Sequence, residues 1–261
     1  MKVVLFCGGQ GMRMRDYSDT LPKPMVPIGP RPILWHLMKY YAHFGHHDFV
    51  LCLGYKGGVI KEYFLDYREE MSNDFVLTEG GGVQLLGRDI DSWRITFVDT
   101  GLHANVGTRL WSVRRFVENE EIFLANYADG LSDLPLDEVI ARLRDSDKAC
   151  AFVTVRPSQT FHVVTADEDG TVTGIDAAGA GDLWVNGGFF VMRPRVFDYM
   201  RPGEELVEEP FRRMIEAGDL MTVRYDGFWV GMDTFKDRQR LDDLYAGGTA
   251  PWQVWRRGEQ T

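Results

Sequence analysis

The chain has 261 residues, of which 44% are apolar and 26% charged, and its net charge is −10. This length allows a large buried core, and the composition is typical of a soluble globular protein. The acidic balance argues against nucleic acid as the main partner, and no apolar run is long enough to predict a membrane span. The three cysteines lie inside apolar runs without a CxxC pair, so we expect buried thiols in a reducing, cytoplasmic setting.

Short apolar runs alternate with amphipathic helical patterns over the first 155 residues. Strands are predicted at Lys2–Cys7, Asp48–Leu53, Arg94–Asp99, Ile122–Tyr127 and Ala149–Val155. Helices are predicted at ILWHLMKYYAHF (33–44), Val59–Met71, Thr108–Glu118 and Leu136–Asp145. This alternation predicts an α/β fold, a doubly wound and mostly parallel sheet with helices on both faces.

The pattern changes after Val155. HVVTADEDGTVTGID predicts a hairpin, WVNGGFFVM a strand, GEELVEEPFRRMIEAG a helix, and LMTVRYDGFWVGMD two strands before a helix at Phe235–Tyr245. No linker interrupts the chain, so we expect a single domain, 1–261, whose C-terminal portion extends the sheet. The tail aromatics Trp252 and Trp255 indicate a contact, within the subunit or between subunits.

The stretch GGQGMRMRDYSDTLPKPM, residues 8–25, follows the first predicted strand. Its glycines Gly8, Gly9 and Gly11 allow close approach of a bulky anion to backbone N–H groups. A dinucleotide fingerprint and a Walker A loop are both excluded, because position 14 is Met and no Gly-Lys-Ser/Thr follows. Arg13, and Lys23 held between two prolines, add fixed positive charge. The stretch therefore predicts a site for a triphosphate or pyrophosphate.

Two aspartates follow predicted strands far apart in the chain. Asp129 comes after IFLANYA and Asp233 after FWVGM. Ligands of open α/β sheets bind at the carboxyl ends of the strands, so the two side chains are expected to meet there. Paired carboxylates commonly hold Mg²⁺ against phosphate oxygens. Each aspartate taken alone also fits a helix N-cap.

With these residues in place, the chain resembles the sugar-1-phosphate nucleotidylyltransferases, and among them the glucose-1-phosphate cytidylyltransferase subgroup. The resemblance covers essentially the whole chain and includes, besides residues 8–25, the stretches PILWHLMKYYAHFG, LGYKGGVIKEYF, ITFVDTG, GTRL, YADG, VNGGFFVM, GFWVGMDT and APWQVW. It implies a Rossmann-like, GT-A-like fold with a nucleotide-binding core over 1–155 and a sugar-binding and C-terminal portion over 156–261. It also implies a homo-oligomer that joins a nucleoside triphosphate, CTP first, to a sugar 1-phosphate.

The resemblance also implies residue roles. In the family pattern Arg13 and Lys23 grip the triphosphate, and Asp129 and Asp233 bind Mg²⁺, with Asp129 also counted as catalytic. The nucleotide is held by Gly8, Gly9, Gly11, Gly54, Tyr55 and Arg109, and the sugar faces Asn186 and Gly187. Tyr55 could equally be a partly buried aromatic beside its strand, and Asn186 a turn residue at a strand edge.

One departure concerns the acceptor. Family members carry a Glu-Lys-Pro element before the NGGFF strand, and its lysine binds the sugar phosphate, whereas this chain has GIDAAGAGDLWVNGG. Arg156, Gln159 and His162, or Lys23 shared between both phosphates, are possible replacements. We therefore expect a modified sugar or a cyclitol phosphate as acceptor in place of glucose 1-phosphate.

Two other functions remain open at this point. A non-catalytic homologue that only binds a nucleotide sugar fits the missing lysine, but not the retained set of Arg13, Lys23 and the two aspartates. A glycosyltransferase would use a D-x-D metal element, and Asp89-Ile90-Asp91 has that form, although it lies in a polar insertion.

Overall fold

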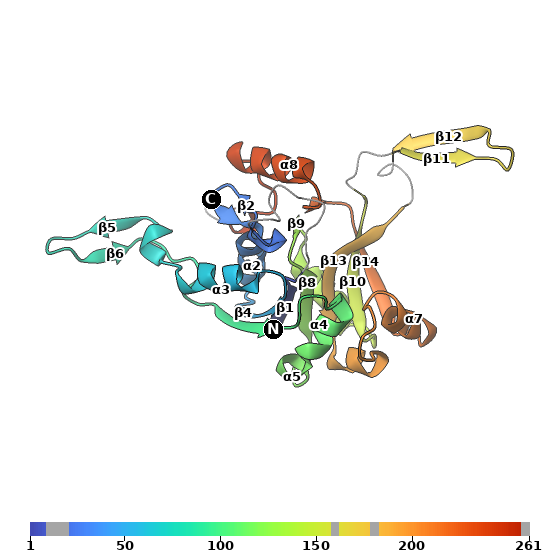
Figure 1. The fold of residues 1–261 in the computed structure, drawn as a ribbon, viewed down its shortest axis with the longest axis horizontal. Helices are drawn as coiled ribbons and strands as arrows, with labels where there is room; N and C mark the ends of the chain where they lie inside the picture. Colours follow the sequence, from blue (N-terminus) through green and yellow to red (C-terminus); the bar gives the residue numbers. More distant parts are fainter. Residues whose placement is uncertain (9–20, 158–161, 178–182, 257–261) are drawn as a thin grey trace.

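The computed structural model describes residues 1–8, 21–157, 162–177 and 183–256. Its centre is a seven-stranded sheet in the order β14-β10-β13-β8-β1-β4-β7, and two hairpins, β5–β6 and β11–β12, project from opposite ends of the molecule (Figure 1). The strands are β1 (Lys2–Phe6), β2 (Pro27–Ile28), β3 (Arg31–Pro32), β4 (Asp48–Leu53), β5 (Phe75–Leu77), β6 (Val83–Leu85), β7 (Arg94–Asp99), β8 (Phe123–Tyr127), β9 (Gly130–Ser132), β10 (Cys150–Val155), β11 (His162–Ala166), β12 (Val172–Ala177), β13 (Val185–Met192), β14 (Leu220–Tyr225) and β15 (Trp229–Gly231).

Helices connect and cover these strands. The α-helices are α2 (Ile33–His43), α3 (Gly57–Leu65), α4 (Val106–Ser112), α5 (Arg114–Val117), α6 (Leu136–Arg144), α7 (Glu209–Glu216) and α8 (Phe235–Ala246). The 3-10 helices are η1 (Lys23–Met25), η2 (Glu69–Met71), η3 (Pro194–Tyr199) and η4 (Val254–Arg256).

The sheet is mostly parallel, as predicted. β8, β1, β4 and β7 are parallel neighbours, and β10 and β14 form a second parallel pair. β13 runs antiparallel between β8 and β10 and joins the two blocks. Because β13 is reversed, its first residues lie at the edge where the parallel strands end. Strands that follow residue 155 do extend the sheet.

Three predicted helices are wrong in extent. The helix expected over residues 203–218 covers only Glu209–Glu216, because Pro210 lies in its first turn. The helix expected over Val59–Met71 ends at Leu65, and η2 follows as a separate turn. The helix expected over Thr108–Glu118 starts earlier, where the Asn105 side chain caps the backbone N–H of Thr108, and divides at Val113 into α4 and α5. The hairpin β5–β6 was not predicted at all, because its strands have only three residues each and no buried face.

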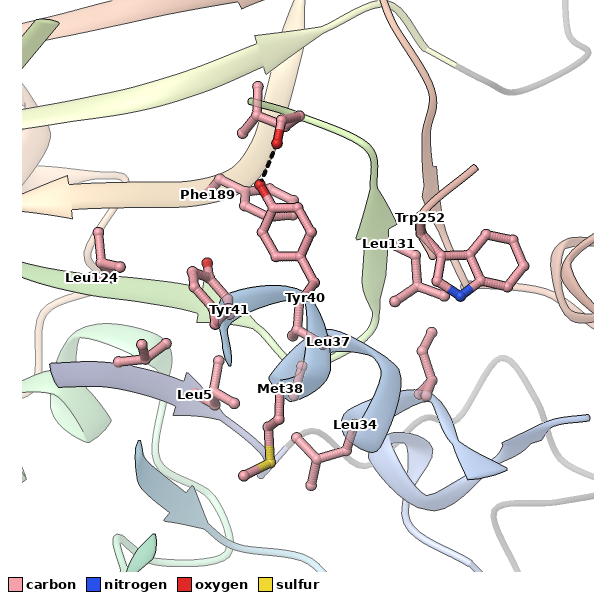
Figure 2. Packing of buried hydrophobic residues seen from close by; sticks show 14 of the residues in the cluster. Leu5, Leu34, Leu37, Met38, Tyr40, Tyr41, Leu124, Leu131, Phe189 and Trp252 are labelled. Atoms are coloured by element: carbon pink, nitrogen blue, oxygen red, sulfur yellow. Dashed lines mark hydrogen bonds between the residues drawn. The ribbon is translucent and has the colours of Figure 1, made fainter. Parts of the chain in front are cut away.

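The core forms two layers, one on each face of the sheet. Along β1, Val3 and Leu5 enter one cluster of buried side chains and Val4 and Phe6 the other, as the two-residue period of a strand requires. Helices α2 and α6 contribute to the first layer, and α4, α5 and α7 to the second. Figure 2 shows the first layer, where the Tyr40 hydroxyl donates to the carbonyl of Leu134 at 2.6 Å.

Two expectations from the composition can be checked here. All three cysteines are buried and free. Among the described residues, no helix has the length and apolar character needed to cross a lipid bilayer.

The aromatic tail packs within the subunit. Trp252 is completely buried, and its indole Nε1 donates to Nδ1 of His36 at 3.3 Å. The His36 Nε2 lies 3.0 Å from the carbonyl of Ile28, so the neutral ring accepts on one nitrogen and donates on the other. Burial lowers the pKa of His36 to about 4. The tail that follows α8 is thus connected to α2 by a hydrogen bond to an uncharged imidazole.

Acidification should destabilise the protein through His36. Its pKa is about 4 when folded and 6.5 by the ordinary value, so the unfolded chain binds the proton first. The contribution of the neutral His36 side chain to the free energy of unfolding is complete above about pH 6.5. This contribution, about 3 kcal/mol, is lost as the pH falls toward about 4. Urea unfolding across this range should show a shallower pH dependence in His36→Gln than in the wild type.

The control for this measurement is His43→Gln, at the exposed end of α2, which should keep the wild-type slope. His46, whose pKa burial also lowers to about 4, is present in every variant and contributes equally to each. Identical slopes in wild type and His36→Gln would contradict the prediction.

Candidate active site

A cavity of about 610 Å³ opens at the edge of the sheet where the parallel strands end. Its walls come from the residues after β1, β7 and β8, the start of β13, the loop before α4, and both ends of β15. Gly8, Lys23, Arg109, Asp129, Asn186 and Asp233 all line it. The structure therefore brings six of the predicted site residues to one cavity.

Lys23 is the polar centre of this cavity. Its Nζ lies 2.7 Å from Oδ2 of Asp129 and 2.7 Å from Oδ1 of Asp233. The Lys23 side chain is only 13% exposed, whereas the side chains of Asp129 and Asp233 are 32% and 44% exposed, so solvent reaches these contacts from the carboxylate side. The two aspartates expected to meet do meet, on one ammonium group.

Local structure explains why these three groups converge. Pro22 and Pro24 flank Lys23, and the turn of η1 closes with the Met25 N–H donating to the carbonyl of Pro22 at 2.8 Å. The short ladder of β9 and β15 pairs Gly130 with Gly231, which aligns the residues on either side of it.

Continuing that ladder, the Met232 N–H donates to the carbonyl of Asp129 at 2.9 Å. Asp233 is not the cap of α8, because Thr234 and Asp237 form a reciprocal capping box there. Asp129 precedes a strand and caps no helix. The N-cap alternative is therefore wrong for both aspartates, and both carboxylates are left for Lys23.

The two carboxylates determine the charge of Lys23. Burial favours the neutral amine, but attraction to Asp129 and Asp233 and their hydrogen bonds outweigh it, so the pKa of Lys23 is raised above its ordinary value. Lys23 is therefore a cation at physiological pH, positioned to meet phosphate oxygens.

Arg109 holds three strand ends together. Its Nη1 donates to the carbonyls of Leu53 and Gly101 and to the hydroxyl of Thr100, at 3.1, 3.0 and 2.7 Å. Its Nη2 donates to the carbonyl of Gly8 at 3.0 Å. The side chain is buried, and burial lowers its pKa. Arg109 lines the cavity, but these hydrogen bonds hold backbone, so its predicted contact with nucleotide remains a prediction.

Gly8 fits under this guanidinium only because it lacks a side chain. A Cβ built on Gly8 would lie 2.1 Å from Cζ of Arg109, and one on Gly54 would lie 2.8 Å from Nη1. The guanidinium cannot move aside without losing its acceptors. Both predicted glycines are thus explained by contact with Arg109, and Gly54 itself does not line the cavity.

The opposite wall belongs to β13 and its neighbours. Asn186 Nδ2 lies 3.4 Å from the Tyr127 hydroxyl, and its Oδ1 accepts from the Gly188 N–H at 2.9 Å. Trp229 Nε1 donates to the carbonyl of Gly187 at 2.9 Å. Asn186 thus faces the cavity, whereas Gly187 contributes to its wall through Trp229.

Other predicted site residues lie elsewhere. Tyr55 does not line the cavity, and the Lys56 ammonium lies 5.3 Å from its ring centroid. Arg156 also does not line it and pairs with Asp226 at 3.0 Å. His162 begins β11, opposite Ala177 of β12. Arg13, Gly9, Gly11 and Gln159 are outside the described residues.

The D-x-D alternative has no support from geometry. Asp89 forms ion pairs with Lys39 at 3.1 Å and Arg31 at 3.4 Å and accepts a hydrogen bond from Tyr67 at 2.9 Å. These contacts fix the base of the β5–β6 hairpin and do not reach the cavity. Asp89 is therefore a structural carboxylate.

Sequence reasoning missed several cavity residues. Tyr127, Trp229, His103 and Glu205 line it without having been singled out. Tyr127 precedes Asp129 by two residues and Trp229 precedes Asp233 by four, so nearness to the predicted ligands was an available signal. Glu205 carried no such signal, because its loop is brought to the cavity only by tertiary packing.

The donor set fits Mg²⁺. Two carboxylate oxygens from separate segments converge on one positive centre, and Mg²⁺ is commonly held by one or two protein carboxylates together with substrate phosphates. Within the described residues, no group of three or more His, Cys, Asp or Glu side chains forms a metal cage. The site therefore suits an ion that arrives with phosphate oxygens.

Comparisons with known proteins agree with this site. A family model described as "Nucleotidyl transferase" matches residues 2–237. Glucose-1-phosphate cytidylyltransferase from Salmonella typhi is 37% identical, over 98% of this chain and 100% of that protein. UTP–glucose-1-phosphate uridylyltransferase from Synechocystis is 24% identical, over 91% of this chain and 61% of that protein. The solved structure of HddC from Yersinia pseudotuberculosis shares the fold, with a TM-score of 0.68 at 18% identity over 94% of this chain and 99% of that one.

Fold, site and these matches define the class: the chain belongs to the nucleotidyl transferase family, in the sugar-1-phosphate nucleotidylyltransferase branch. Within that branch it is similar over nearly its whole length to glucose-1-phosphate cytidylyltransferases. It is a nucleotidyltransferase enzyme.

Gly8→Ala should lower both stability and catalytic activity. The added methyl group displaces the guanidinium of Arg109, which holds the ends of β1 and β4 and the residues after β7. A displacement of this kind is expected to lower kcat/KM about 10²-fold. Steady-state pyrophosphate release, with urea unfolding in parallel, measures both effects.

The control is Gly58→Ala in α3, where a Cβ meets nothing within 4 Å and activity should be unchanged. Normal activity of Gly8→Ala would show that the contact between Gly8 and Arg109 does not position the residues of the cavity.

Proposed function

We propose that the enzyme transfers a cytidylyl group from CTP to a sugar 1-phosphate and releases pyrophosphate. The observation that carries this proposal is the ammonium of Lys23 held by Asp129 and Asp233 at the centre of the cavity. A cation and two carboxylates, in a cavity lined by Gly8 on one side and by a polar wall on the other, suit the meeting of two phosphate groups. In this proposal the nucleotide lies on the side of the cavity formed by the ends of β1, β4 and β7. The acceptor lies on the side formed by β13.

The reaction needs positioning more than acid–base catalysis. An oxygen of the acceptor phosphate, already anionic, attacks the α-phosphorus of CTP, and the bond to the pyrophosphate oxygen breaks on the opposite side. No proton has to be removed from the nucleophile. Lys23 neutralises charge that develops at the α-phosphorus and the leaving group, while Gly8 offers close backbone approach.

Asp129 and Asp233 would hold Mg²⁺. When bound, the ion screens the repulsion between the phosphates of the two substrates. The same carboxylates hold the ammonium of Lys23 at 2.7 Å. The aspartates thus have two roles, to orient Lys23 and to bind the cation.

CTP is the proposed donor because identity is highest toward a relative named as a cytidylyltransferase among those reported above. A more distant relative is named for UTP. The loop from Leu102 to Val106, with Asn105 and His103, lines the nucleotide side of the cavity. A pyrimidine base would lie against this loop.

Asp129→Asn and Asp233→Asn should each lower kcat by about 10²- to 10³-fold, on the scale of a lost electrostatic contact at a reacting centre. The cause is the loss of one carboxylate charge from the Lys23 and metal site. Pyrophosphate release at saturating Mg²⁺ measures the effect, and urea unfolding checks that the fold is intact.

Asp169→Asn, at the exposed tip of β11–β12, is the control and should behave as wild type. A near-normal rate in either active-site variant would remove that aspartate from the proposed mechanism.

The donor preference has its own test. With one acceptor held constant, kcat/KM should be highest for CTP, next for UTP, and lowest for the purine triphosphates, because the relative of highest identity reported above is named for CTP and a more distant one for UTP. Pyrophosphate release with the four triphosphates measures this order. Equal or better use of GTP or ATP would overturn the cytidylyl assignment and leave the nucleotidyltransferase class intact.

A further inference from the structure

Two arginines share one tryptophan beside the acceptor wall. The guanidinium carbon of Arg156 lies 4.8 Å, and that of Arg224 5.1 Å, from the ring centroid of Trp184. Arg156 follows β10, Arg224 belongs to β14, and Trp184 directly precedes β13. We call these three residues the arginine platform.

The arginine platform lies on the same face of the sheet as Asn186. In the sheet, Thr154 of β10 is paired with Asn186 on one side and with Arg224 on the other. Paired residues on adjacent strands point to the same face, and so do residues two apart along one strand. Trp184 therefore shares the face of Asn186, and Asn186 lines the cavity. The platform continues the acceptor wall of the cavity toward the edge of the sheet.

The platform carries an excess of positive charge. Asp226 pairs with Arg156 at 3.0 Å. In the described part of the chain, no carboxylate lies within ion-pair distance of Arg224, and that side chain is exposed. Its stacking on Trp184 orients the guanidinium and leaves its N–H donors available.

The platform is too far from Lys23 to bind the reacting phosphate. β8, which leads to Asp129, and β14 are three strand spacings apart, or about 14 Å. A sugar whose 1-phosphate lies at Lys23 extends its far side toward β10 and β14. An arginine side chain is long enough to span much of the distance between β14 and the far side of the sugar.

We propose that Arg224, together with Arg156, binds a second anionic group of the acceptor, a carboxylate or phosphate at the end of the sugar opposite its reacting phosphate. A guanidinium fork matches either group with paired hydrogen bonds. This inference rests on the proposed function and adds the substrate class: a sugar 1-phosphate with an additional negative charge.

The test compares acceptors that differ only in the added charge. Glucose 1-phosphate, glucuronic acid 1-phosphate and glucose 1,6-bisphosphate are assayed with CTP in the wild type, Arg224→Ala and Arg224→Lys. The wild type should prefer a doubly anionic acceptor, and the preferred one identifies the group as carboxylate or phosphate. Arg224→Ala should raise KM for that acceptor about 10- to 100-fold, with kcat, KM for CTP and glucose 1-phosphate kinetics unchanged. Arg224→Lys should recover part of the loss.

The control is Arg94→Ala. Arg94 is a strand arginine at the other edge of the same sheet, 78% exposed and 3.5 Å from Asp48, so its loss removes a similar surface charge. This variant should match the wild type with every acceptor. If glucose 1-phosphate is preferred and Arg224→Ala leaves all three acceptors unchanged, the inference is overturned while the proposed function stands.

A binding measurement separates the two proposals if no acceptor is turned over. Calorimetric titration of the wild type and Arg224→Ala with glucuronic acid 1-phosphate and glucose 1,6-bisphosphate requires no catalysis. Weaker binding of either acceptor to the variant by about tenfold or more supports the platform even when the proposed reaction fails. Equal affinity of the two proteins for both acceptors overturns it.

Discussion

The site depends on one constraint: a buried ammonium must have carboxylate partners. Lys23 finds them 106 and 210 positions away along the chain, in Asp129 and Asp233. A charge taken from water without such partners would be costly, so the three segments are stable only together. The rigid Pro-Lys-Pro turn and the β9–β15 ladder bring them to one place. The catalytic geometry is thus tied to the folding of the whole chain.

The two halves of the cavity are built by different means. On one side, Arg109 fixes the backbone carbonyls at the ends of β1 and β4 and after β7, and the cavity is lined by Gly8, by Arg109 itself and by the loop from Leu102 to Val106. On the other side, the side chains of Asn186, Tyr127 and Trp229 form the wall. A substitution in this second wall changes the cavity directly, whereas the strand ends on the first side keep their spacing as long as Arg109 is present.

Much of the fold could be predicted from the sequence, for a physical reason. β4 and β7 have the predicted bounds, because both strands contain a short apolar run that the sequence shows directly. The meeting of Asp129 and Asp233 followed from the rule that ligands bind at strand ends. The engagement of both by Lys23 did not, because it depends on the register of β9 against β15, which only tertiary packing sets. The division of the helix at Val113 and the three-residue strands of β5–β6 also lack a local signal.

The antiparallel strand β13 has a consequence for how the polypeptide is made. It separates the parallel block β8-β1-β4-β7 from the pair β10-β14, and its residues follow those of β10 in the chain. During synthesis the first block can assemble once residue 127 has been added, but β10 has no neighbour in that block until β13 arrives between them. The edge of β8 therefore stays unpaired for tens of residues of translation, and unpaired edges are where chains associate wrongly. For the ribosome-bound chain, the part of the sheet made of β13, β10 and β14 is the last to form, and until then the edge of β8 is exposed to misassembly.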